Sequence, residues 1–281
     1  MKGLLWRRAK DRVMLFLAAL MGVIILVPVV GMLWLVVSHA WPALSIGLFT
    51  QVTVGTGGGL ANAIVGTFYV VGLGILIAGP LGILAGVYVG EVDPGGRFAQ
   101  VVRFTTDVMA GVPSIVIGYF GYITMVLGLG WGYSTLAGAI ALALIGLPYV
   151  VRSTETALVK VPRGMREASL ALGAGQATTI WRVTLREALP GVATGVLLAL
   201  SIAIGETAPL LYTAGWSSYM PSWQLTHAQI GYLTYVVWTY INEPFASANA
   251  LAYAAGFLLL VLIVLVNVVA RRLVSRTRVS R

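Results

Sequence analysis

The sequence lacks cysteine and has few charged residues. No cysteine occurs among its 281 residues, which excludes disulfides, thiolate metal sites and cysteine nucleophiles. Charged residues make up only 10% of the chain, whereas soluble domains carry roughly 25%. Hydrophobic residues make up 59%, and the mean hydropathy is +0.93. This balance excludes an ordinary soluble domain.

Several kinds of catalytic and binding site are also missing. No Gly-Lys-Ser or Gly-Lys-Thr occurs, so the chain has no phosphate-cradling P-loop of its own. No nucleophile and base stand together, and the two histidines, His39 and His227, have no clustered carboxylates. We therefore expect no enzymatic activity, no metal site and no cofactor bound by this chain.

Long uncharged runs indicate membrane spans. Residues 13–90, 108–151 and 207–242 contain no charged side chain. Each run exceeds the ~20 apolar residues that cross a hydrocarbon core. Helices satisfy their own backbone hydrogen bonds in lipid, so the pattern predicts a helical membrane protein that crosses the bilayer several times.

Turn and polar signals divide these runs into six helices. The first apolar run is longer than the 7–15 residues of a cleaved signal peptide, so we expect a retained helix. The domain plan is a basic N-terminus at 1–12, a transmembrane domain at 13–270 with a cytoplasmic loop at 152–188, and a basic tail at 271–281. The expected spans are 13–37, 63–89, 106–129, 135–151, 189–214 and 250–270.

The distribution of basic residues predicts the topology. The 18 Lys and Arg residues all fall in the segments that this span assignment puts on one face, which makes that face cytoplasmic. The net charge of +9 therefore reflects topology and not nucleic-acid binding. A seventh span at 225–241 would place the tail outside. We instead expect an interfacial segment there, with headgroup-level aromatics Tyr232, Tyr235, Trp238 and Tyr240.

The cytoplasmic loop contains a short amphipathic helix. Pro162 and Gly173 bracket it, because proline stops one helix and glycine ends the next. One interpretation is a solvated hairpin. The other is a docking helix with a small apolar contact surface, oriented at a polar rim by Arg163, Arg166 and Glu167.

Residues in this loop resemble a known family. Glu167-Ala168-Ser169, then Gly173, Val183, Leu185 and Leu189-Pro190 are similar to the "EAA" loop of permease subunits in bacterial ATP-binding-cassette importers. The resemblance implies that this helix couples the spans to a separate ATPase subunit. Ser169 replaces an alanine of the family pattern, and Arg186 stands where the family has proline.

Three further segments narrow the family. Segments 80–91, 111–118 and 204–211 resemble the A-type permease of phosphate-specific importers. That resemblance implies an all-α, six-span, type I (MetI-like) fold in a bacterial inner membrane with both termini cytoplasmic. It also implies a second homologous permease, two ATPase subunits, an extracytoplasmic phosphate-binding protein and phosphate as substrate. Alternatives are a permease for another oxyanion or small solute, or a stand-alone secondary transporter or channel.

Glu206 is the only acid within a predicted span core. An intramembrane carboxylate costs several kcal/mol unless it is paired, protonated or hydrated. The spans offer it no basic partner, and Pro209 removes a helical donor for the carbonyl of Gly205. Three roles stay open: a gate contact or intersubunit pair, a structural acid, and a direct anion contact. The candidate translocation or subunit-contact residues are Gly205, Glu206, Thr207, Pro209, Pro113 and Ser114.

Overall fold

The computed structural model describes residues 2–279; Met1 and residues 280–281, the ends of the predicted basic segments, lie outside the described residues. It is almost entirely helical, with one two-stranded hairpin in which Thr53 pairs with Gly58. The elements are α1 (Lys2–Ala40), η1 (Trp41–Ala43), α2 (Ile46–Thr50), β1 (Thr53–Val54), β2 (Gly57–Gly58), α3 (Ala61–Val87), η2 (Tyr88–Val92), α4 (Arg97–Gly111), α5 (Ser114–Gly121), η3 (Tyr122–Gly128), α6 (Thr135–Val159), α7 (Arg163–Ala171), α8 (Gln176–Thr178), η4 (Thr179–Thr184), α9 (Leu185–Gly205), α10 (Ala208–Thr213), α11 (Leu233–Tyr240) and α12 (Ala246–Val279).

The described part of the chain contains five helical stretches that can span a membrane, and a bent pair of helices that can form a sixth span. Five helical stretches are long and apolar enough to span: Lys10–Ala43, Ala61–Val92, Thr135–Val159, Gln176–Gly205 and Ala246–Arg272. The sixth crossing is α4 followed by α5 and η3, which are bent by 102° at the break between them. The predicted six spans are reached when this bent pair is counted as one span, and that third span is a broken helix and not the continuous one expected at 106–129.

The core is a bundle of α3, α6, α9 and α12. The most extensive contacts join α3 to α6 and α6 to α9, while α12 covers α9 and α11. Small residues allow the closest approach: a Cβ added at Gly82 of α3 would lie 2.7 Å from the Cβ of Val150 on α6. Such close backbone packing is the main source of association between helices in lipid.

The loop expected at 152–188 is mostly helical. Helix α6 continues to Val159, and α9 is reached without a gap through α8 and η4, from Gln176 onward. The physical reason is that Arg, Glu, Thr and Lys are tolerated in a helix once it has left the bilayer, so α6 ends only before Pro162. Arg152 therefore lies on a helix, α6, and not in the loop that was expected.

The aromatic residues expected at headgroup level are mainly buried. Tyr232 is 1% and Tyr240 6% exposed, and Trp216 stacks on Tyr235 with ring centroids 4.4 Å apart. The expectation of interfacial anchors is therefore wrong for these tyrosines, because they pack on one another against the core; only Trp238, 62% exposed, suits it. Helix α11, with eight residues, is too short to be a seventh span.

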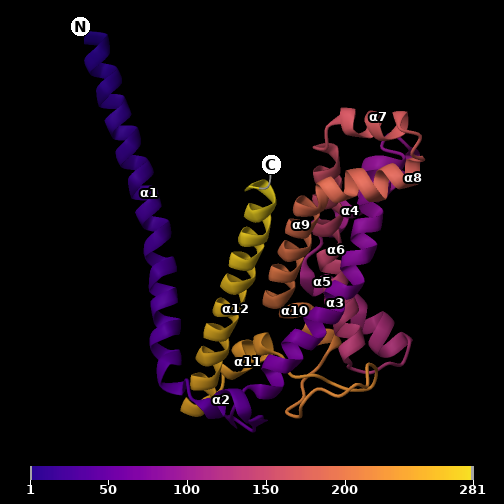
Figure 1. Ribbon diagram of the computed structural model, residues 1–281. Helices are drawn as coiled ribbons and strands as arrows, with labels where there is room; N and C mark the ends of the chain where they lie inside the picture. The colour runs from indigo at the N-terminus through magenta and orange to yellow at the C-terminus, as the bar shows by residue number, and fades with distance from the viewer. Residues whose placement is uncertain (1, 280–281) are drawn as a thin grey trace.

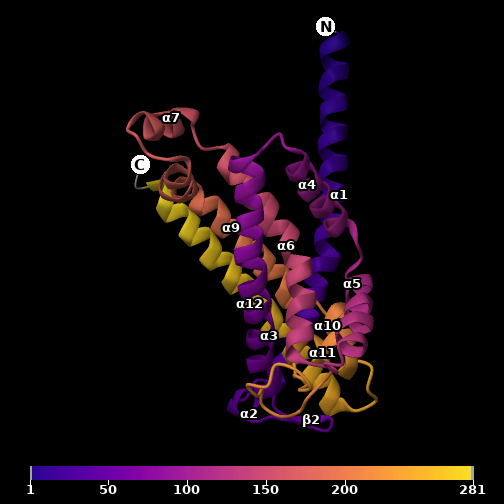
Figure 2. The ribbon, with the colours of Figure 1, turned by 90° about the vertical axis from the view of Figure 1, so that its right-hand side faces the viewer.

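Figure 1 shows how the elements divide between two ends of the molecule. Both ends of the described chain lie toward the same end as α7 and α8, whereas α2 and α11 lie at the other. Helix α1 leans away from the bundle and meets α12 near its own C-terminal end, where the rings of His39 and Tyr253 are 4.7 Å apart. Figure 2 shows α7 at the outer end of the molecule, to one side of α3 and α6.

Candidate functional site

The third crossing breaks at Pro113. Helix α4 ends at Gly111, and Val112 and Pro113 are extended, with ψ of 129° and 135°. Proline disfavours the helical conformation of the residue before it and cannot donate a backbone hydrogen bond. Ser114 therefore starts a new helix, α5, in a new direction.

The fifth crossing breaks at Glu206. Helix α9 ends at Gly205, Glu206 is extended with φ −72° and ψ 131°, and Thr207 precedes the short helix α10. Pro209 lies in the first turn of α10 and has no N–H to offer the carbonyl of Gly205. Glu206 was expected inside a continuous span ending near Ala214; it lies instead in the non-helical link between two helices.

The two breaks lie side by side. The side chain of Ser114 lies close to the carboxyl group of Glu206, and α5 packs on α10. A Cβ added at Gly118 would lie 2.7 Å from the Cα of Pro209, so the glycine permits this approach. Thr234 of α11 also donates to the carbonyl of Glu206 at 2.9 Å. Three elements thus converge on Glu206.

The carboxyl group of Glu206 is not neutralised by the rest of the described chain. Glu206 is half-buried, and no ion pair to it occurs among the residues that the structure describes. Gly205 is exposed and Thr207 half-buried, whereas Pro209 is buried against the core. The arrangement presents an acid at an irregular backbone link between broken helices, the kind of position at which membrane transporters build binding sites.

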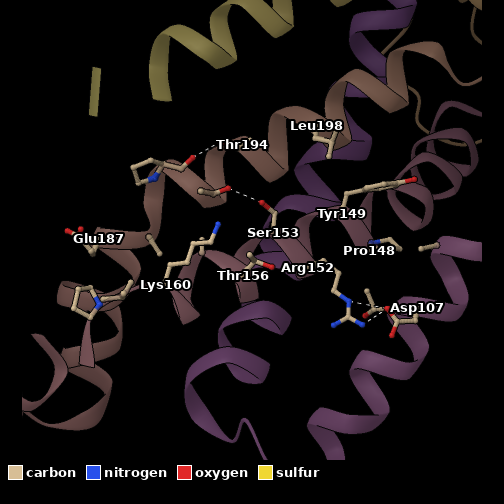
Figure 3. A pocket seen from close by; sticks show the side chains of 18 of the residues that line it. Asp107, Pro148, Tyr149, Arg152, Ser153, Thr156, Lys160, Glu187, Thr194 and Leu198 are labelled. Carbon is tan, nitrogen blue, oxygen red and sulfur yellow. Dashed lines mark hydrogen bonds and ion pairs between the residues drawn. The ribbon is translucent and has the colours of Figure 1, made fainter. Parts of the chain in front are cut away.

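An open cavity of about 1170 Å³ lies between α4, α6 and α9 (Figure 3). One end includes Ala110 and Leu198, close in sequence to the two breaks, and the other includes Pro162 and Met165, where α7 begins. The cavity therefore extends from the last turns of α4 to the base of α7. Its polar lining includes Asp107, Arg152, Ser153, Thr156, Lys160, Glu187 and Thr194.

Helix α7 is exposed and ends as predicted at a glycine. Leu172 is 89% and Leu170 51% exposed, and no residue of α7 is buried. Gly173 has φ +82°, and the amides of Gly173 and Ala174 donate to the carbonyls of Leu170 and Ser169. Only a residue that tolerates positive φ closes the helix in this way. The helix thus presents an apolar surface outside the bundle.

Two polar contacts attach α7 to the bundle. Arg166 forms a bidentate ion pair with Glu91 of η2, with its Nε 3.0 Å from Oε2, and it also donates to the carbonyls of Leu158 and Val161 at 2.7 Å. Ser169 and Thr179 of η4 share a hydrogen bond of 2.9 Å. Arg166 was expected at a polar rim of α7, but it faces inward. Arg163, Glu167 and Ala168 are exposed.

Some residues of these sites could not be predicted from the sequence. Thr234 lies far along the chain from Glu206, and nothing in its neighbourhood marks it. Lys160 and Thr156 were read as part of a loop, so their common helical face was hidden. Among the described residues, no group of three potential metal ligands gathers anywhere.

Comparison with known proteins identifies relatives along nearly the whole chain. "Phosphate transport system permease protein PstA 2" of Mycobacterium bovis is 43% identical over 249 residues, covering 88% of this chain and 82% of the relative. "Phosphate transport system permease protein PstA" of Haemophilus influenzae is 41% identical over 268 residues, covering 95% and 94%. Both matches extend beyond the segments singled out in the sequence.

A solved structure supports the fold. A chain of the "MetNI methionine ABC transporter" in an inward-facing conformation aligns with a TM-score of 0.58 at 22% identity, over 88% of this chain and 97% of that one. The family model for "Binding-protein-dependent transport system inner membrane component" matches residues 78–279. The broken third crossing, the cavity and α7 all fall within or at the edge of this range. The chain therefore belongs to the family of binding-protein-dependent transport system inner membrane components, as a PstA-type member.

Proposed function

We propose that this chain is a transmembrane permease subunit of an ATP-driven importer for inorganic phosphate. The assignment of phosphate as the substrate is supported by the 41% identity with the Haemophilus influenzae PstA protein over 268 residues. A membrane component of a binding-protein-dependent system receives its solute from a separate protein. Selection of phosphate then rests largely on an extracytoplasmic phosphate-binding protein.

The importer would contain a second, homologous permease and two ATPase subunits, because this chain carries no P-loop. In this proposal the chain binds no cofactor of its own and does not hydrolyse ATP. Helix α1 needs a partner subunit or lipid to cover it, since its most apolar stretch is not buried by the rest of the described chain. The basic segments, including those at both termini, would face the cytoplasm of a bacterial inner membrane.

Helix α7 would transmit ATP-driven movement to the spans. Its exposed residues, including Glu167, Ala168 and Arg163, would contact the ATPase, while Arg166 and Ser169 hold the helix to η2 and η4. Since η2 directly follows α3 and η4 directly precedes α9, a displacement of α7 would reach two spans directly. Gly173 ends α7, and so determines the length of the helix that would contact the ATPase.

The two breaks would act as the gate region. The irregular links at Pro113 and Glu206 join rigid helices, and such points accept changes in backbone angles more readily than a continuous helix. Glu206 would make a gate contact or pair with a basic residue of the second permease. The cavity between α4, α6 and α9 would be the inner half of the pathway, open on the side of α7.

Reconstitution of the complete importer tests this function. The chain, its partner permease and the ATPases are placed in vesicles with a phosphate-binding protein outside and ATP inside. We expect uptake of radiolabelled phosphate and ATP hydrolysis that both require the binding protein. Uptake of another oxyanion with its own binding protein, and none of phosphate, would reassign the substrate. Uptake without ATP or a binding protein would instead indicate a stand-alone transporter and overturn the proposal.

A further inference from the structure

One face of α6, together with Lys160 directly after its last turn, carries two cations and a hydroxyl in a row. Arg152, Thr156 and Lys160 are spaced four residues apart, which places them one above another on a helix. All three line the cavity described above, and Figure 3 shows the side chain of Lys160 extending into it. The row runs along the part of α6 nearest to α7.

The two cations of this row are in different states. The guanidinium group of Arg152 already pairs with two acids: its Nε lies 3.1 Å from Asp107 Oδ1 and its Nη1 lies 3.0 Å from Glu155 Oε2. Lys160 is exposed, and no hydrogen bond or ion pair to its side chain occurs among the described residues. The ammonium group of Lys160 is therefore available to an anion without displacing an acid, whereas Arg152 becomes available only if Asp107 is exchanged.

The hydroxyl groups that line the cavity with Lys160 also differ in whether they already donate a hydrogen bond. Ser153 donates to the carbonyl of Gly191 at 2.9 Å, and Thr194 donates to that of Pro190 at 2.8 Å. Thr156 is exposed and has no such bond among the described residues. A tetrahedral oxyanion beside Lys160 would thus find one free hydroxyl donor, and charge-assisted bonds of this kind are the strong ones.

The acids of the cavity limit the strength of such a site. Asp107 and Glu187 line the same space as Arg152 and Lys160, so the formal charges of these four side chains cancel. A dianion bound at Lys160 would be attracted locally but held weakly. Weak binding is what an exit requires, since conduction needs a site that an ion can also leave.

We propose that Lys160 and Thr156, joined by Arg152 when it exchanges Asp107 for the substrate, form a low-affinity oxyanion site at the cytoplasmic mouth of the pathway. Phosphate passes through this site on release. The inference rests on the proposed function, because it assumes that the cavity is the inner half of a phosphate pathway. It predicts that phosphate on the cytoplasmic side competes for the site and slows uptake.

Trans-inhibition of uptake tests this site. Vesicles of zwitterionic lipid containing the complete importer are preloaded with ATP and increasing inorganic phosphate, and the initial rate of labelled phosphate uptake is measured. Zwitterionic lipid removes competition from anionic headgroups. We expect internal phosphate to inhibit the wild-type importer, and Lys160→Gln to need about tenfold more phosphate for half-inhibition, the effect of one lost charge-assisted bond. Thr156→Val should shift inhibition in the same direction.

Matched variants separate this site from a general effect of charge. Lys160→Arg keeps a cation in the cavity and should retain inhibition. Arg97→Gln removes an exposed cation at the start of α4, outside the cavity, and should behave as wild type. The site is refuted if internal phosphate does not inhibit an importer that transports normally, or if Lys160→Gln and Arg97→Gln are inhibited alike. Loss of all phosphate uptake by the wild-type importer would contradict the proposed function instead.

Discussion

Glu206 combines an ionisable side chain with a break in the backbone. Its carboxyl group lies close to the side chain of Ser114 in another broken crossing, and its carbonyl accepts a hydrogen bond from Thr234. A purely structural acid would need only these internal contacts. The half-exposed carboxyl and the absence of an ion pair within the described chain favour a contact made with something else, either the partner permease or a moving gate.

Replacement of Glu206 by glutamine tests this role. The amide has the same shape and can still contact Ser114, so we expect normal assembly and stability. The charge is lost, and phosphate uptake should fall about tenfold or more, because a hydrogen bond to a charged group contributes ~1.5–3 kcal/mol. Uptake in vesicles and thermal unfolding are measured together, with Glu243→Gln as the control acid. Wild-type uptake by Glu206→Gln would leave only a structural role.

The pairing of Arg166 with Glu91 makes a second prediction at this scale. Both side chains are largely shielded, at 22% and 7% exposed, so Arg166→Ala leaves an unpaired acid beneath α7. Breaking a buried pair costs ~3–5 kcal/mol, and we expect a loss near the lower end. Thermal unfolding should show this loss, and less phosphate should be transported per ATP hydrolysed. Arg163→Ala, on the exposed side of α7, should not lower the unfolding temperature; an equal decrease in both variants would contradict the assignment.

At the scale of the helices, the limits of sequence reasoning are clearest at proline. Pro28, Pro80, Pro148 and Pro190 lie inside continuous helices, whereas Pro113 and the Glu206 link near Pro209 interrupt theirs. Proline alone therefore does not decide between a tolerated kink and a break. The outcome depends on which neighbouring groups satisfy the freed carbonyls, and those neighbours come from distant parts of the chain.

Other elements were predictable because their signals are local. The apolar runs indicated the number of crossings, and Pro162 with Gly173 marked the two ends of α7. Glu206 was identified because an acid in an apolar run is costly wherever the helix lies. Its proximity to Ser114, the inward turn of Arg166 and the cavity face of Lys160 depend on packing between helices, which no local pattern contains.

The contact between α5 and α10 gives a prediction for these elements. A Cβ at Gly118 would meet the Cα of Pro209, so Gly118→Ala should force the two broken crossings apart at a cost of ~1–3 kcal/mol. Gly111→Ala is the matched control, because a Cβ there meets nothing within 4 Å. We expect Gly118→Ala to lower both the unfolding temperature and phosphate uptake. Equal uptake by the two variants would show that this close approach has no part in transport.

At the scale of the whole molecule, the charges and the fold point to the same orientation. The basic segments near the termini and around α7 lie toward one end of the molecule in Figure 1, and α2 and α11 lie at the other, where Figure 2 also shows β2. The positive-inside rule predicts that the basic end faces the cytoplasm. The same end carries the exposed apolar residues of α7, so the surface proposed for the ATPase lies on the side where ATP is present.

The absence of cysteine allows this orientation to be tested without removing any native residue. Single cysteines are introduced as Trp223→Cys, at a side chain 92% exposed in the segment before α11; as Gly95→Cys, in the exposed turn before α4; and as Ala270→Cys, near the end of α12. A membrane-impermeant maleimide should label Trp223→Cys in intact cells, but Gly95→Cys and Ala270→Cys only after permeabilisation. If segment 225–241 crossed the membrane, Ala270→Cys would react from outside while Gly95→Cys stayed protected. Reaction of Gly95→Cys in intact cells would reverse the whole topology, and α7 could then not reach an ATPase in the cytoplasm.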